Sequence, residues 1–144
     1  MKPRPTYPRT RYEPSPPPDL QDPATRERLS RSALKAFFRI LERWKVPDEI
    51  GRDLFGGVSN GKFYKMKREA GRVLGADELL RISYLVGIFK ALHVLYSEAL
   101  ADRWMSRPNT NPIFGGRTPL DYVHAGGIPA MQAVRRLLDA RRGG

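Results

Sequence analysis

The residues best suited to bind a partner lie in a basic segment from Ser59 to Arg68. Ser59 is a favourable helix N-cap, and the amides at such an N-terminus attract phosphate. Asn60 can hydrogen-bond adenine, Lys65 or Arg68 can bond guanine, and a tyrosine can contact a phosphate or a thymine methyl group. This chemistry favours DNA recognition by Ser59, Asn60, Lys62, Tyr64, Lys65, Lys67 and Arg68. A bracing or solvated basic helix has a similar composition, and Gly61 lowers its helix propensity.

Two short helices are predicted to position this segment as a helix-turn-helix. The first opens at Pro47-Asp48-Glu49, with acids in the first turn where the helix dipole favours them, and stops at Gly56-Gly57. The second runs from about residue 60 to residue 73, and its inner face is expected to hold Phe63, Met66, Ala70 and Val73. In this motif the first helix braces against the DNA backbone and the second enters the major groove.

Residues for catalysis or metal binding are few. His93 lies in an apolar segment and is expected to be a core or interface histidine, while His124 follows Asp121 at a spacing that allows a local hydrogen bond. No Ser/His/Asp set, clustered carboxylate pair, Walker sequence or GxGxxG motif stands out. With no cysteine and two histidines, neither a thiolate site nor a His-rich metal centre is expected. The sequence therefore predicts no catalysis, no cofactor and no metal.

Length, charge and hydropathy favour a small binding protein. The chain has 144 residues, which fit one small domain plus a tail, and 40% of them are hydrophobic, enough for a core. Its 26 Lys+Arg against 15 Asp+Glu give a formal charge of +11, which favours an anionic partner such as nucleic acid. Prolines interrupt the basic first residues and no apolar stretch follows them, so no signal peptide is expected. The longest apolar stretch, residues 82–95, is too short to span a bilayer. We expect a soluble, cytoplasmic protein.

The chain divides into three predicted regions. Residues 1–22 form a proline-rich basic arm that is expected to be extended or disordered, because proline lacks an amide donor and fixes φ. Such an arm either touches DNA phosphates or wraps a partner, or it is a leader without a role. Residues 23–96 hold a first helix ending at about Trp44, the helix-turn-helix, and a fourth helix starting at Asp77. The fourth helix is apolar on nearly every side, so it is expected to be central or covered by a second subunit.

Residues 97–144 form the third region. A helix over residues 98–107 is followed by a loop over residues 109–117, which contains Asn-Pro and Gly-Gly turn signals. Thr118 is expected to cap a short helix that stops at Gly126-Gly127, and the last helix covers residues 129–140. No segment alternates polar and apolar residues convincingly, so the chain is predicted to be all-α, a helical bundle with a small helical C-terminal region.

The third region also carries a distinctive series of residues. Trp104 is followed by Pro108-Asn109, Gly115-Gly116, Thr118-Pro119-Leu120-Asp121, Gly126-Gly127, a helix with Val134 and Leu138, and Gly143-Gly144. The spacing by itself indicates a specific packed loop. The series resembles the toxin-binding domain of the Xre/MbcA/ParS family of type II antitoxins. The resemblance covers about residues 34–144, with a looser match of the first four helices to the family's Xre-like helix-turn-helix region.

The resemblance implies an all-α dimer that binds its own operator and a toxin encoded beside it. The toxins of this family are RES-domain or ParT-like enzymes that consume NAD or transfer ADP-ribose, and the antitoxin's C-terminal end can cover or enter their active-site cleft. Carried onto this chain, the toxin-binding residues are Trp104, Asn109, Phe114, Thr118, Pro119, Leu120, Arg141, Arg142, Gly143 and Gly144. For the two arginines the alternative is an ordinary basic helix end, favourable to the helix dipole.

Two other functions remain open. One is a stand-alone helix-turn-helix transcriptional regulator without a toxin partner. The other is a basic RNA- or ribosome-associated protein in which the arm, rather than the predicted DNA-reading helix, dominates binding. Removal of residues 1–22 separates them, because only the RNA-associated protein should then lose most of its affinity.

Overall fold

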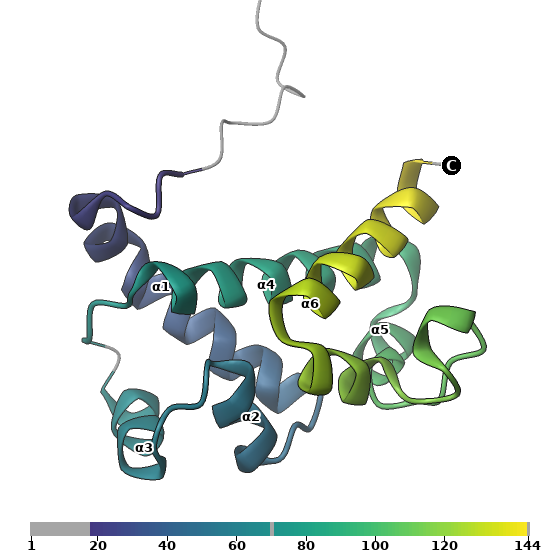
Figure 1. The fold of residues 1–144 in the computed structure, drawn as a ribbon, viewed down its shortest axis with the longest axis horizontal. Coiled ribbons are helices and arrows are strands. Elements are labelled where there is room, and N and C mark those ends of the chain that lie inside the picture. The colour runs from purple at the N-terminus through teal and green to yellow at the C-terminus, as the bar shows by residue number, and fades with distance from the viewer. Residues whose placement is uncertain (1–17, 70, 144) are drawn as a thin grey trace, which may run out of the picture.

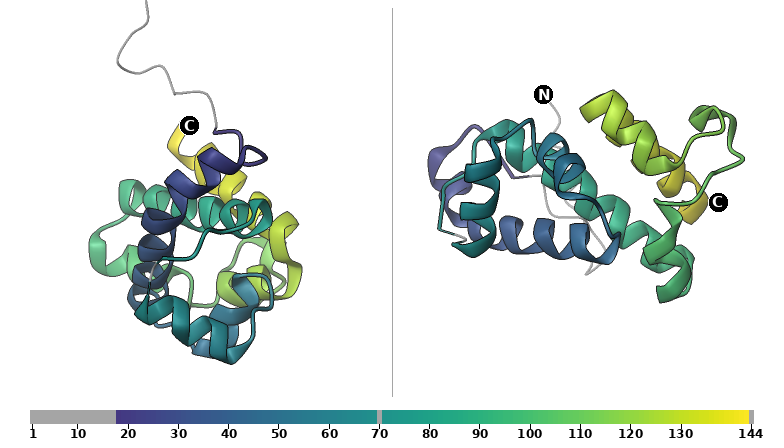
Figure 2. Two further views of the ribbon diagram at one scale, coloured as in Figure 1. Left: turned by 90° about the vertical axis from the view of Figure 1, so that its left-hand side faces the viewer. Right: turned by 90° about the horizontal axis from the view of Figure 1, so that it is seen from below.

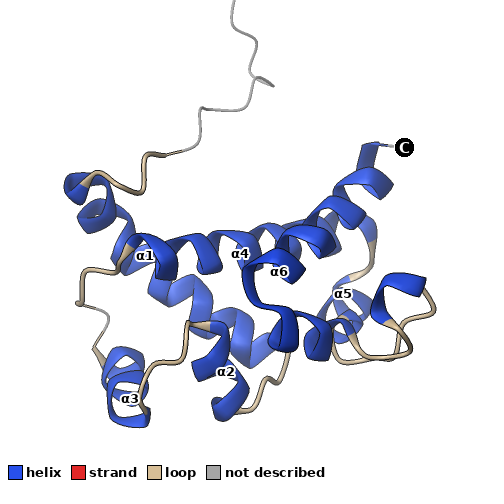
Figure 3. Cartoon of the chain, viewed as in Figure 1, coloured by secondary structure: helices blue, strands red, loops and turns tan. Residues whose placement is uncertain are grey.

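The described part of the chain consists of helices and loops. The computed structural model describes residues 18–69 and 71–143, and within them it contains six α-helices and no strand (Figures 1 and 3). The predicted all-α class is therefore confirmed. Most of the predicted arm, residues 1–17, lies outside the described residues. The elements are α1 (Pro23–Arg43), α2 (Asp48–Leu54), α3 (Asn60–Arg68), α4 (Ala76–Leu95), α5 (Glu98–Trp104), the 3-10 turn η1 (Pro112–Phe114) and α6 (Pro119–Gly143).

Three helices begin at the polar residue that the sequence predicts as a cap. The Asp22 carboxylate accepts a hydrogen bond from the Ala24 amide at 3.3 Å, ahead of α1. Ser59 Oγ accepts one from the Lys62 amide at 3.3 Å, and Thr118 Oγ1 accepts one from the Asp121 amide at 3.0 Å. Each bond satisfies an amide that has no partner within its helix, which is why these residue types stabilise helix starts.

Two helices end earlier than predicted. α3 stops at Arg68 instead of continuing to Val73, which is 52% exposed, so the assignment of Val73 to an inner face is wrong. The chain leaves the helix because Leu74 enters the core and its amide donates to Ser30 Oγ at 2.8 Å. α5 stops at Trp104, and the predicted loop after it contains η1, which Asn111 caps.

α6 is interrupted where two successive glycines predict a stop. The backbone at Gly127 has φ +61° and ψ −145°, a region essentially restricted to glycine. On the N-terminal side of this break, His124 Nε2 lies 2.8 Å from Asp53 Oδ2 of α2. On the other side, Gln132 donates to the Tyr84 hydroxyl of α4 at 2.8 Å. The break thus lets the two halves of α6 pack against different helices.

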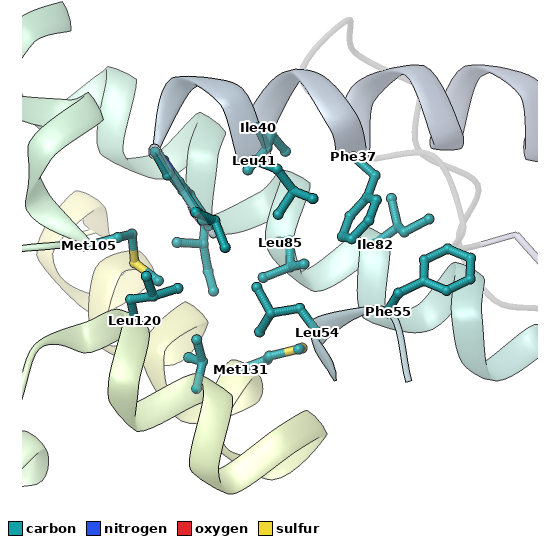
Figure 4. Packing of buried hydrophobic residues seen from close by; sticks show 14 of the residues in the cluster. Phe37, Ile40, Leu41, Leu54, Phe55, Ile82, Leu85, Met105, Leu120 and Met131 are labelled. Atoms are coloured by element: carbon teal, nitrogen blue, oxygen red, sulfur yellow. The ribbon is translucent and has the colours of Figure 1, made fainter. Parts of the chain in front are cut away.

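α4 is the central helix of the fold, as its all-round apolar sequence predicts. It packs against α1, α5 and α6, and Leu85 and Ile88 on it are fully buried. All six helices contribute to one apolar cluster around it, shown in Figure 4 by Phe37, Leu54, Leu85, Leu120 and Met131. Both predicted helical regions, before and after residue 96, therefore share one core. Within the described residues, no helix has the length and hydropathy needed to cross a membrane.

Polar side chains also connect α1 with α5. Arg43 Nε and Nη2 lie 3.0 and 2.9 Å from Asp102 Oδ2, and Nη2 lies 2.7 Å from Glu98 Oε1. The hydrogen bonds to Asp102 and Glu98 raise the pKa of Arg43 above its usual value. These bonds fix the start of the C-terminal region against the N-terminal helix.

Candidate functional site

The outer side of α3 presents the cations predicted to bind DNA. Phe63 and Met66 are buried against the core. Gly61, Lys65 and Arg68, spaced by four and three residues, lie on the opposite side of the helix and are exposed. No acidic side chain of the described residues forms an ion pair with Lys62, Lys65, Lys67 or Arg68. Their charges are available to an anionic partner.

The other predicted DNA-binding residues have different environments. Ser59 uses its hydroxyl to cap α3, and Asn60 is exposed at the helix start. The Tyr64 hydroxyl donates to Asp48 Oδ2 of α2 at 2.5 Å, and this hydrogen bond raises the pKa of Tyr64. Lys67 faces away from Lys65 and lines a groove of about 670 Å³ between α1 and α3. Tyr64 must release Asp48 before its hydroxyl can donate to a phosphate.

The loop after α5 is built around aromatic rings packed edge to face. The Phe114 ring is fully buried and lies edge-on between Trp104, with centroids 5.9 Å apart, and Tyr122, with centroids 5.3 Å apart. The Arg117 guanidinium lies over the Tyr122 ring at 5.6 Å. Edge-to-face rings and a cation over a ring face are both attractive arrangements. They hold the loop in one shape.

Hydrogen bonds from backbone amides complete the loop. Asn109 Oδ1 accepts from the Asn111 amide at 2.9 Å, and Asn111 Oδ1 accepts from the Ile113 amide at 3.1 Å. The Leu120 amide donates to the Met105 carbonyl at 2.9 Å and closes the loop at its base. The predicted packed loop is present, and both of its asparagines hold it through hydrogen bonds.

The structure brings six of the predicted toxin-binding residues together in this loop, largely inside it. Phe114, Pro119 and Leu120 are buried, and Trp104, Asn109 and Thr118 are half-buried. The loop's exposed surface includes Gly115, Gly116 and Ile113, whose side chain is 41% exposed. Ile113 is an exposed apolar residue that the sequence did not single out, because its position in a loop gives no period from which exposure can be inferred.

The predicted toxin-binding residues at the chain end lie beyond the core. Leu138 is the last buried residue of α6. Arg141 donates to the Tyr96 hydroxyl at 3.0 Å, and Arg142 Nη1 lies 3.8 Å from Asp139 Oδ1. Gly143 is exposed, and Gly144 lies outside the described residues. Figures 1 and 2 show this last turn and α3 at opposite ends of the molecule.

The histidines form contacts within the fold. His93 Nδ1 lies 2.8 Å from the Phe89 carbonyl oxygen, and the centroids of the His93 and Phe89 rings lie 4.1 Å apart. These contacts are those expected of a histidine that packs within the fold. His124 contacts Asp53, 71 positions away in sequence, and not Asp121 as its spacing suggested. Among residues 18–69 and 71–143, no three His, Cys, Asp or Glu side chains gather as a metal site.

Comparisons with known proteins give two matches. Residues 90–144 match the family model of the antitoxin Xre/MbcA/ParS C-terminal toxin-binding domain. This segment comprises the end of α4, α5, the packed loop and α6. A protein of Sinorhizobium fredii (strain NBRC 101917 / NGR234) named "Uncharacterized protein y4oB" is 40% identical over 112 residues, 77% of this chain and 84% of that protein. No solved structure matches the chain.

Proposed function

Because the chain belongs to the Xre/MbcA/ParS antitoxins, whose C-terminal toxin-binding domain matches residues 90–144, we propose that it neutralises a NAD-consuming or ADP-ribosylating toxin by direct binding. The toxin is a RES-domain or ParT-like enzyme, and the chain itself supplies no catalytic group. The match to the toxin-binding domain is the observation that carries this proposal.

The form of the C-terminal region supports neutralisation by steric blocking. The loop from Asn109 to Arg117 is held by its own hydrogen bonds, so little conformational entropy is lost when it docks. The last turn of α6 extends beyond the core and carries Arg141, Arg142 and Gly143. In this proposal Arg141 and Arg142 enter an anion-binding or nucleotide-shaped cleft of the toxin, and the loop contacts its surface.

A second part of the proposal is repression of the chain's own operon by α3. Two observations support it: α2 and α3 are consecutive short helices joined by a turn at Gly56-Gly57, and Lys65 and Arg68 form no ion pair with a described side chain. Phosphate contacts would make operator affinity fall steeply with added salt. Operator and NAD are both cytoplasmic, so we place the pair in the cytoplasm.

Repression requires two reading helices, and hence a homodimer. α4 is apolar on nearly every side. A largely apolar groove of about 600 Å³ lies between α1 and α4 and is lined by residues such as Leu29 and Leu80. These features support α4 as the dimer contact, which would place the α3 helices at half-sites about one DNA turn apart.

Purification of the tagged chain from nuclease-treated native cells tests the central proposal. We expect a small enzyme encoded by the adjacent gene to copurify in near-stoichiometric amount. If the chain binds a defined operator but carries no such enzyme, it is a stand-alone regulator, an alternative favoured by the exposed cations of α3. Copurifying ribosomal proteins would instead support the RNA-associated alternative.

A further inference from the structure

A groove of about 600 Å³ runs between α4 and the second half of α6. Its α4 wall includes Val86, Lys90 and Val94, and its α6 wall includes Arg135 and Arg142. Val94 is 65% exposed, so a large aliphatic side chain faces solvent among the cations. The groove therefore offers an apolar contact and positive charge together.

Gly87 forms part of this groove and allows a close approach of the two helices. A Cβ atom at this position would lie 1.4 Å from Arg135 Nη1 and 2.6 Å from Arg135 Cζ. The guanidinium thus occupies the space that any side chain at position 87 would fill. Arg135 Nε donates to both carboxylate oxygens of Asp139, at 3.1 Å to Oδ1 and 2.9 Å to Oδ2. These bonds fix the guanidinium in place.

The charges around the groove do not cancel. Asp139 Oδ2 lies 2.9 Å from Arg135 Nε, and Asp139 Oδ1 lies 3.8 Å from Arg142 Nη1. The two arginines therefore share one carboxylate. Lys90 is exposed and forms no ion pair with any described side chain. Three cations therefore face one carboxylate. Asp139 accepts from Nε of Arg135, so an added carboxylate near Lys90 could form charge-assisted hydrogen bonds with the Nη groups of Arg135.

We propose that this groove docks an acidic segment of the cognate toxin, with a carboxylate at Lys90 and Arg135 and an apolar neighbour against Val86 and Val94. The inference rests on the proposed function, in which the chain holds a toxin. The family-matched segment begins at residue 90 and so includes Lys90, Val94 and both arginines. The exposed valine favours a protein segment over a phosphate backbone, and the cations of the groove disfavour pairing with the same groove of a second copy.

The first test measures the affinity of the full chain for a catalytically inactive form of the toxin encoded beside it. Lys90→Glu reverses the charge at an exposed position without removing a core contact. We expect the Kd to rise about ten-fold or more, since a like charge is then placed opposite the toxin's carboxylate. Lys35→Glu, an equal charge change on the exposed side of α1, is the matched control and should change the Kd less than about two-fold.

A second variant perturbs the groove without changing any charge. Gly87→Ala forces the Arg135 guanidinium out of its position, while alanine favours the helix more than glycine does. We expect this variant to keep its helical circular-dichroism spectrum and to bind the toxin several-fold more weakly. Unchanged affinity would show that the position of Arg135 does not matter for docking.

The outcomes separate the groove from the function on which it depends. If the unmodified chain does not bind the toxin, the proposed function fails, and the docking proposal falls with it. If the unmodified chain binds and Lys90→Glu binds as well as Lys35→Glu, the groove is not the docking site, although the proposed function stands. If Lys90→Glu weakens binding only to a DNA duplex, and more than Lys35→Glu does, the groove binds nucleic acid and the proposal is overturned.

Discussion

At the scale of single residues, the buried side of α3 differs in character from its exposed, basic side. Phe63 and Met66 hold the helix in the core, and Lys65 and Arg68 lie opposite them without an acidic partner among the described residues. Tyr64 differs from its neighbours because Asp48 already occupies its hydroxyl. If α3 binds the operator, we expect its affinity to depend mainly on Lys65 and Arg68.

The double variant Lys65→Ala with Arg68→Ala should weaken binding to operator DNA by about ten- to a hundred-fold, because each side chain contributes either a base contact or a phosphate contact. Toxin binding should stay unchanged, since α3 and the C-terminal turn lie at opposite ends of the molecule. Electrophoretic mobility shifts at several salt concentrations measure the effect. Arg103→Ala with Arg107→Ala removes the same charge from the C-terminal region as a control, and equal losses in both variants would refute α3 as the reader.

At the scale of helices, the break in α6 depends on Gly127. Alanine there should cost about 1–3 kcal/mol of unfolding free energy, because its Cβ disfavours φ +61° with ψ −145°. Gly61→Ala is the matched control: space at position 61 is open, and alanine should stabilise α3 by up to about 1 kcal/mol. Urea unfolding measures both variants. An unfolding free energy for Gly127→Ala equal to that of the unmodified chain would contradict the role of the break.

The last turn of α6 should be dispensable for folding and needed for neutralisation. Removal of residues 141–144 leaves Leu138 and every other core residue in place. We expect unchanged thermal unfolding and operator binding, and an affinity for the toxin lower by about ten-fold or more. Calorimetric titration of the toxin with both chains gives the comparison. Full affinity in the truncated chain would exclude insertion of the chain end into the toxin.

Helix starts were predictable from sequence, and some helix ends were not. Caps such as Asp22, Ser59 and Thr118 act on amides two or three positions away, so the local sequence determines them. The end of α3 depends on burial of Leu74 and on its bond to Ser30, 44 positions away. The Asp53–His124 contact is likewise long-range. The motif around Trp104 located the loop, but residue type alone does not show that Phe114 is buried and Ile113 exposed.

At the scale of the molecule, one core joins the predicted DNA-binding and toxin-binding regions. Leu120 and Met131 of α6 belong to the same cluster as Phe37 of α1 and Leu54 of α2 (Figure 4). A fragment of residues 90–144 loses these partners and is small for an independent domain. We expect it to show no cooperative thermal transition by circular dichroism, whereas residues 18–144 should unfold cooperatively. A sharp transition in the short fragment would show that the toxin-binding region folds independently.

We propose that this chain neutralises a NAD-consuming or ADP-ribosylating toxin by binding to it. The most direct measurement is the rate of NAD turnover by the purified toxin encoded beside it, titrated with the full chain. We expect the rate to fall close to zero as the chain approaches a stoichiometric ratio, because a stable complex blocks the toxin's cleft. An undiminished rate in the presence of a large excess of correctly folded chain would contradict neutralisation by direct binding.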